Sequence, residues 1–161
     1  MTTTPARPNG KQYGVVSAEQ RSAVSGLEFV QALVAGALPM NTMARTLGYR
    51  IVEAENGRVV VAARPSEEHP EGVVHGGLAA TLLDTRMGLA VRSTLEKGVA
   101  ATTFKLKVSL LRAVTPQTGE VRAEGTVLSR GRRVGTAEGR LTDRDGRLLA
   151  HGTATCLVFD H

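Results

Sequence analysis

The chain has 161 residues and a mass of 17.0 kDa, a length that fits one compact domain. Hydrophobic residues make up 42% and charged residues 22%, which is the balance of a globular protein and excludes disorder throughout the chain. With no Trp, two Tyr and three Phe, the core must be aliphatic, and a nucleic-acid binder that stacks bases on aromatic side chains is disfavoured. The net charge of +5 suits an anionic small molecule as much as a nucleic acid and does not choose between them.

The N-terminal segment predicts a tail rather than a targeting signal. Residues 1–16 contain Pro and Gly and lack the continuous apolar core of a secretory signal, so we expect a flexible tail followed by a single domain over residues 17–161. The most apolar window, residues 29–40, is too short to cross a bilayer. Together with the single cysteine, Cys156, which lies in an apolar run, these features predict a cytoplasmic protein without membrane contact and an inert thiol.

Two capping-box patterns predict the first helical region. Ser17 and Ser25 each stand three residues ahead of a Gln or Glu, so we expect a helix to start at one of them and to stop near residues 36–39. Asn41 then favours a short second helical turn that ends at Gly48.

A hairpin and a long helix follow. Residues 48–54 and 58–64 are rich in Ile and Val and are separated by Asn-Gly at 56–57, the strongest short signal for two antiparallel strands. Residues 77–95 are predicted to form one long helix, mostly apolar with one small and polar stripe. Such a helix is typical of an element that other parts of the protein surround.

The remaining chain is predicted to be sheet. Apolar and polar residues alternate over residues 104–110 and 120–127, and further strands are expected near 134–142 and 147–159. The order of elements indicates an α+β fold in which one antiparallel sheet packs against a central helix.

The segment that opens the long helix carries the chemistry. It contains His75-Gly76-Gly77, and Asp84 follows nine residues after the histidine. Backbone amides at a helix N-terminus can receive a developing oxyanion, and glycines let a substrate approach closely. A carboxylate inside an apolar helix is costly unless it faces a cavity or polar partners, so Asp84 is the candidate nucleophile or general base.

Each of these features also has an ordinary structural explanation. The two glycines suit a tight turn, His75 suits a core histidine bonded to backbone, and Asp84 suits a carboxylate paired with Arg86 or Arg92. Their combination at this spacing favours the functional interpretation. A metal site is disfavoured, because His69 and His75 have no Cys or suitably spaced acidic partner.

The motif resembles that of the hotdog-fold acyl-CoA thioesterases of the phenylacetate-degradation and 4-hydroxybenzoyl-CoA thioesterase group. In these proteins an Asn or Gln and a Gly precede His-Gly-Gly, and an Asp or Glu follows nine residues after the His. The resemblance covers about residues 40–159 and departs from the pattern at two positions. His69 stands where relatives carry Asn or Gln, and Gly88 stands where the Glu-using branch carries Thr.

The resemblance implies a hotdog fold, assembled as a dimer or a dimer of dimers, that hydrolyses an acyl-CoA with an aryl or medium-chain acyl group and needs no metal or redox cofactor. Gly76 would polarise the carbonyl, Asp84 would attack it or activate water, His69 and Thr85 would position the reactants, and His75 would shape the loop. The residues expected to bind substrate, with the basic turn holding the nucleotide end of CoA, are Gly77, Thr81, Gly88, Ser129, Arg130, Arg132 and Arg133.

Helix geometry adds an expectation about assembly. The eight steps from Gly76 to Asp84 span roughly 12 Å along a helix, too far for both residues to touch one carbonyl, so we expect the site to be shared between two subunits. A non-catalytic acyl-CoA-binding or regulatory hotdog protein and a hotdog dehydratase remain alternative functions. The alternative for the arginines at 130–133 is a solvated turn.

Overall fold

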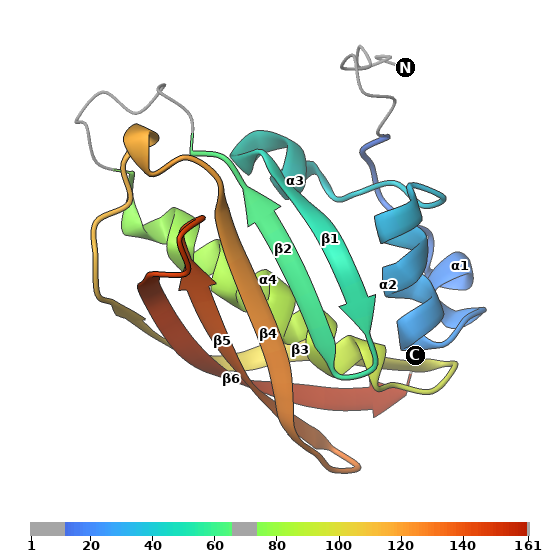
Figure 1. Ribbon diagram of the computed structural model, residues 1–161. Coiled ribbons are helices and arrows are strands. Elements are labelled where there is room, and N and C mark those ends of the chain that lie inside the picture. Colours follow the sequence, from blue (N-terminus) through green and yellow to red (C-terminus); the bar gives the residue numbers. More distant parts are fainter. Residues whose placement is uncertain (1–11, 66–73, 161) are drawn as a thin grey trace.

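In the computed structural model, which describes residues 12–65 and 74–160, one antiparallel sheet wraps around a long helix (Figure 1). The helices are α1 (Ala18–Ser22), α2 (Gly26–Ala35), α3 (Thr42–Leu47) and α4 (Gly76–Ser93), and a 3-10 turn, η1, covers Pro116–Thr118. The strands are β1 (Tyr49–Glu55), β2 (Arg58–Ala63), β3 (Val99–Leu110), β4 (Val121–Arg130), β5 (Val134–Thr142) and β6 (Leu148–Asp160). The predicted α+β architecture, a hotdog fold, is confirmed.

The six strands lie in the order β1-β2-β4-β5-β6-β3, and every neighbouring pair is antiparallel. Helix α4 contacts all six strands, so the sheet surrounds it as the apolar sequence predicted. Its buried face consists chiefly of Ala79, Leu82, Leu83, Met87, Ala90 and Val91. Strands β1 and β3 form the two edges of the sheet.

Local signals account for the first half of the chain. Both capping boxes form, at Ser17 and at Ser25, so each starts a helix where only one was expected. The glycines at 36 and 48 end α2 and α3 with φ of 74° and 67°, the left-handed conformation that glycine adopts without strain. The Asn-Gly turn joins β1 to β2, again with a positive φ, 79°, at Gly57.

Two boundaries differ from the sequence prediction. Helix α4 starts one residue earlier than expected and ends at Ser93 rather than at residue 95, because His75 caps it and the backbone N–H of Thr94 already bonds back to Val91. Strand β3 starts at Val99, five residues before the alternating pattern. Residues ahead of the alternating pattern join the strand because they pair with β6, where Val99 lies opposite Asp160.

The N-terminal elements close one side of α4. Helix α2 packs against both α4 and β1, and the N–H of Gly26 donates to the carbonyl of Leu95 at 2.9 Å. A Cβ atom on Gly26 would lie 1.7 Å from the backbone oxygen of Arg92, so only glycine permits this approach. Ahead of α1, Gln12 and Gly14 hydrogen-bond to the backbone of Met40, so the described end of the predicted tail lies against the domain. No helix among the described residues is both long and apolar enough to cross a membrane.

Candidate active site

The N-terminus of α4 is capped by the histidine of the motif. Nδ1 of His75 accepts a hydrogen bond from the backbone N–H of Gly77 at 2.9 Å, and the His75 side chain is exposed. The capping interaction satisfies one of the amides that every helix leaves unpaired in its first turn. It also takes the Gly77 amide out of the set that could bind a substrate.

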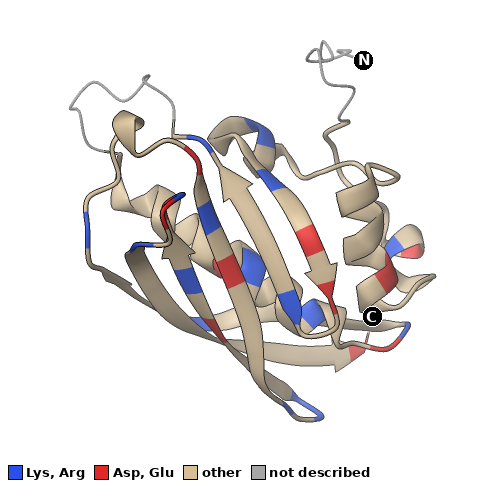
Figure 2. Cartoon of the chain, in the orientation of Figure 1, with Lys and Arg blue, Asp and Glu red and all other residues tan. Residues whose placement is uncertain are grey.

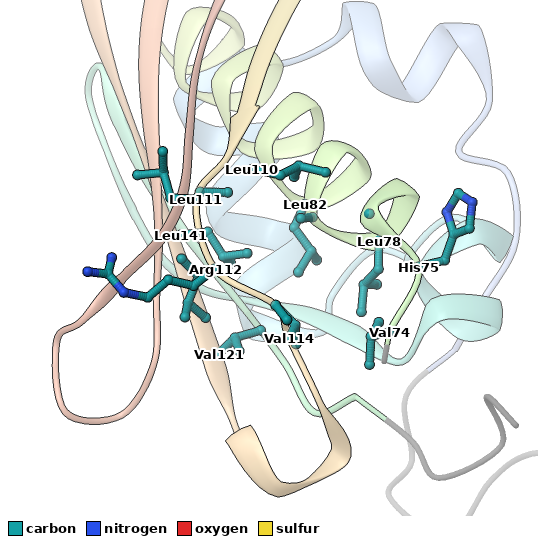
Figure 3. Close-up of a pocket in the computed structure, with 15 residues that line it drawn as sticks. Val74, His75, Leu78, Leu82, Leu110, Leu111, Arg112, Val114, Val121 and Leu141 are labelled. Atoms are coloured by element: carbon teal, nitrogen blue, oxygen red, sulfur yellow. The ribbon is translucent and has the colours of Figure 1, made fainter. Parts of the chain in front are cut away.

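The amide of Gly76 has no such partner. Among residues 12–65 and 74–160, no acceptor takes a hydrogen bond from its N–H. Gly76 lines the apolar hollow, a cavity of about 250 Å³ between the start of α4 and the residues that follow β3. Figure 3 shows aliphatic side chains such as Leu82 and Val114 converging on this hollow, while the His75 ring lies to one side of them. A Cβ atom on Gly76 would lie 2.5 Å from Cδ1 of Leu110.

Asp84 faces a different cavity. It lies half-buried in α4 and lines the carboxylate hollow, about 420 Å³ in volume, which is bounded by α4, α2, β1 and β3. Its Oδ1 atom is buried and has no hydrogen-bond partner among the described residues. Neither Arg86 nor Arg92 forms a salt bridge with it in that part of the chain, so the pairing considered from the sequence is absent there.

Two residues of this hollow were missed from the sequence. Thr103 on β3 and Cys156 on β6 lie opposite each other in the sheet and line the carboxylate hollow beside Asp84, Thr85 and Gly88. A Cβ atom on Gly88 would lie 3.6 Å from Oγ1 of Thr103. The strand therefore places a hydroxyl over the position where Glu-using relatives carry Thr on the helix.

The thiol of Cys156 is buried. Burial raises its pKa, and the charge of Asp84 raises it further. A thiol with a raised pKa stays protonated at neutral pH and is a poor nucleophile, which agrees with the expected inert role.

Arg86 is buried between α4 and strands β4 and β5. Its side chain has no exposed surface and its Nη1 donates to the carbonyl of Leu82 at 2.6 Å, while burial lowers its pKa to about 9. Gly125 and Gly139, paired across β4 and β5, leave room for it, since a Cβ atom on Gly139 would lie 3.1 Å from Nη2. Two residues further along a helix than Asp84, Arg86 points to the other side of α4.

The predicted basic turn lies at the far end of the β4–β5 hairpin, the blue tip in Figure 2. Arg130, Arg132 and Arg133 line a third cavity together with Glu96 and Asp160. Arg130 forms a salt bridge with Glu96 at 2.9 Å, whereas Arg132 and Arg133 are exposed and form no salt bridge within the described ranges.

The structure thus brings some predicted site residues together and separates others. Asp84, Thr85 and Gly88 share the carboxylate hollow. Thr81 donates to the carbonyl of Gly77 at 2.8 Å and Ser129 is exposed on β4, and neither lines the three cavities described here. His69 lies outside the described residues.

Comparison with known proteins identifies the class to which this fold and these cavities belong. The sequence pattern of the Thioesterase superfamily matches residues 71–150. An esterase candidate of Halobacterium salinarum is 44% identical over 99 residues, which are 57% of this chain and 64% of that protein.

Solved structures agree with this match. A thioesterase candidate of Ralstonia eutropha, related to phenylacetic acid degradation, is 31% identical with a TM-score of 0.70, over 79% of this chain and 97% of that one. A hypothetical thioesterase of Streptococcus pneumoniae, solved with coenzyme A, is 26% identical with a TM-score of 0.63, over 70% of this chain and 87% of that one. The chain therefore belongs to the thioesterase superfamily, which confirms the predicted class, a thioester hydrolase with the hotdog fold.

Proposed function

We propose that the protein hydrolyses an acyl-CoA thioester to the free acid and CoA, with Gly76 and Asp84 as its principal catalytic residues. The observation that carries the proposal is that two groups of the motif have no hydrogen-bond partner among the described residues. One is the Gly76 amide at the start of α4, and the other is Oδ1 of Asp84, which is buried in the carboxylate hollow. The coenzyme A bound by the Streptococcus pneumoniae relative supports CoA as the thiol part of the substrate.

The Gly76 amide stabilises charge on the carbonyl oxygen. It lies at the positive end of α4, an 18-residue helix, where the N–H and the dipole both favour an anion. An oxyanion that forms during attack on the thioester is stabilised more than the neutral carbonyl, so this contact accelerates the reaction. His75 occupies the neighbouring amide and so holds the first turn of the helix in place.

Asp84 supplies the attack on the carbonyl carbon. As a general base it takes a proton from water, and the new C–O bond expels CoA as the thiolate. As a nucleophile it forms a mixed anhydride that water then hydrolyses, with the same products. The hydroxyls of Thr85 and Thr103 lie in the same hollow and position the attacking water or the carboxylate.

Two copies of the chain are needed to complete this site. Gly76 and Asp84 line different cavities, and along α4 they are separated by roughly 12 Å. Edge strand β3 carries the exposed apolar side chains of Phe104, Leu106 and Leu110, as expected of an edge that pairs with a second copy. Gly76 lies beside Leu110, so a dimer through β3 brings the start of one α4 near its partner. In this dimer Gly76 of one subunit and Asp84 of the other act on the same carbonyl.

The basic turn holds the nucleotide end of CoA. Arg132 and Arg133 are exposed on the β4–β5 hairpin, and guanidinium groups bind phosphate oxygens through paired hydrogen bonds. Arg130 has a smaller part, because Glu96 already binds it.

The proposed acyl-CoA hydrolase activity and the role of Asp84 are tested with the variant Asp84→Asn, which keeps the size of the side chain and removes its basicity. Thiol release from a panel of aryl and aliphatic acyl-CoAs measures turnover, and calorimetry with a non-hydrolysable CoA thioether measures binding. We expect the variant to lose at least about a hundredfold in kcat while its affinity for the thioether is retained.

The matched control is Asp145→Asn, in an exposed turn, which should behave as the wild type. Turnover of D84N close to the wild-type rate would refute the role of the carboxylate. A wild-type protein that binds CoA esters without releasing thiol would instead be the regulatory binder.

A further inference from the structure

The carboxylate hollow has a charged end away from Asp84. The charged residues that line it, within the described part of the chain, are Asp84, Arg21 and Arg92. Apolar side chains, among them Phe29 and Leu33 of α2, form much of the remaining wall. With one carboxylate, which the proposed reaction uses, and two guanidinium groups, the carboxylate hollow has an excess of positive charge.

Arg92 is held in this cavity by α2. The carbon at the centre of its guanidinium lies 3.9 Å from the centroid of the Phe29 ring, a cation–π contact that fixes the group. Its Nε is buried and has no hydrogen-bond partner among the described residues. Burial lowers the pKa of Arg92, and the nearby charge of Arg21 lowers it further.

The two arginines have no anionic partner in the described residues. None of the salt bridges there includes Arg21 or Arg92, and Arg21 uses Nη1 to donate to the carbonyl of Val16 at 3.1 Å. Asp84 does not serve as the counter-charge, since no salt bridge among the described residues joins it to either arginine. Two cations that share a partly buried cavity repel each other, and a bound anion would relieve both the repulsion and the unmet hydrogen-bonding capacity.

We propose that the carboxylate hollow binds the acyl group of the substrate and that Arg92, with Arg21, recognises a carboxylate at its remote end. The inference rests on the function proposed above and adds a substrate class, the CoA thioesters of short dicarboxylic acids. Asp84 and Arg92 are eight residues apart, roughly 12 Å along α4, so the acyl group that fits between them is short. The apolar wall from α2 accommodates its methylene groups.

The test compares dicarboxylic thioesters with uncharged esters of equal chain length. Glutaryl-CoA and adipoyl-CoA are matched to valeryl-CoA and hexanoyl-CoA, and the measured quantity is the ratio of kcat/KM for each pair. We expect the wild type to favour the dicarboxylic member at least about tenfold, and Arg92→Gln to lower that ratio by about ten- to a hundredfold, the effect of losing a charge-assisted hydrogen bond.

Three further variants keep the result interpretable. Arg144→Gln removes an exposed arginine from the Asp143–Gly146 turn and should leave the ratio unchanged. Arg92→Lys retains the charge and should recover part of the preference. If R92Q does not fold because it loses the contact with Phe29, Arg21→Gln tests the same end of the cavity and should also lower the ratio.

The outcomes separate the two proposals. A wild-type preference for the uncharged esters, or an equal loss on both series as expected if Arg92 bound the phosphates of CoA, would overturn the dicarboxylate proposal and leave the hydrolase intact. If neither these four esters nor the aryl and aliphatic panel described above releases thiol, the hydrolase proposal fails. Calorimetry with glutaryl-CoA and valeryl-CoA then tests the dicarboxylate proposal by binding alone. The proposal requires the wild type to bind glutaryl-CoA more tightly than valeryl-CoA, and R92Q to lose this preference.

Discussion

Nδ1 of His75 accepts a hydrogen bond from the backbone N–H of Gly77 at 2.9 Å. This contact makes His75 the N-cap of α4, with φ −57° and ψ 133°. The histidine of the motif therefore caps the helix, and the Gly76 amide is left without a hydrogen-bond partner among the described residues.

A first prediction concerns this cap. His75→Ala should lower the free energy of unfolding by about 1 kcal/mol, because one amide of α4 loses its acceptor, and His75→Asn should restore most of the loss since Asn also caps helices well. Denaturant unfolding measures both changes. His151→Ala, at an exposed position on β6, serves as the control. Equal stability of the His75→Ala variant and the wild type would show that the cap contributes nothing.

A second prediction tests whether the site is shared between subunits. Gly76→Pro removes the proposed amide donor at the first helical position, where proline is well tolerated. The ψ of 133° at His75 also suits a following proline. Gly76→Ala is the matched control, because it meets the same Leu110 side chain but keeps the N–H. We expect Gly76→Pro to lose about a hundredfold or more in kcat, and Gly76→Ala to lose much less.

Mixing inactive chains completes this test. Heterodimers of Gly76→Pro and Asp84→Ala chains should regain one complete site and about half of the wild-type activity, as measured by thiol release after separation of the mixed species. Verified heterodimers as inactive as their parents would rule out the shared site.

A third prediction concerns the β4–β5 turn. Arg132→Ala and Arg133→Ala should each raise KM for CoA esters several-fold, with little change for the corresponding pantetheine thioesters, which lack the nucleotide. The affinity of the wild type for CoA should also fall more steeply with salt than that of the variants, because exposed ion contacts are screened. Arg144→Ala is the control. An equal change in KM on both substrate types would assign these arginines to a solvated turn.

A fourth prediction contrasts two helical glycines. Gly88→Ala should stabilise the protein by up to about 1 kcal/mol, because alanine favours the helix and its Cβ would make an ordinary contact, 3.6 Å, with Thr103. Gly26→Ala makes the same chemical change at the start of α2, yet it should destabilise by about 2 kcal/mol or more, because its Cβ would lie 1.7 Å from a backbone oxygen. Thermal and denaturant unfolding of the two variants measure these opposite signs. Similar effects of the two substitutions would contradict the close packing of α2 on α4.

The sequence by itself determined the local features of this protein. The Ser17 and Ser25 caps, the Asn-Gly hairpin and the single long helix each depend on residues within a few positions of one another, so neighbouring side chains and backbone preferences suffice to specify them. The spacing of Asp84 from His-Gly-Gly is equally local, and together with the predicted order of helices and strands it indicated the family to which the chain belongs.

The tertiary structure alone decided which distant residues meet. Thr103 lies over Gly88, and Arg92 over Phe29, through the packing of β3 and α2 on α4, while Glu96 neutralises Arg130. None of these pairs is joined by a periodic pattern in the sequence. They follow from strand register and helix docking, which depend on the burial of the whole core, and for that reason the contents of the carboxylate hollow could be known only from the folded chain.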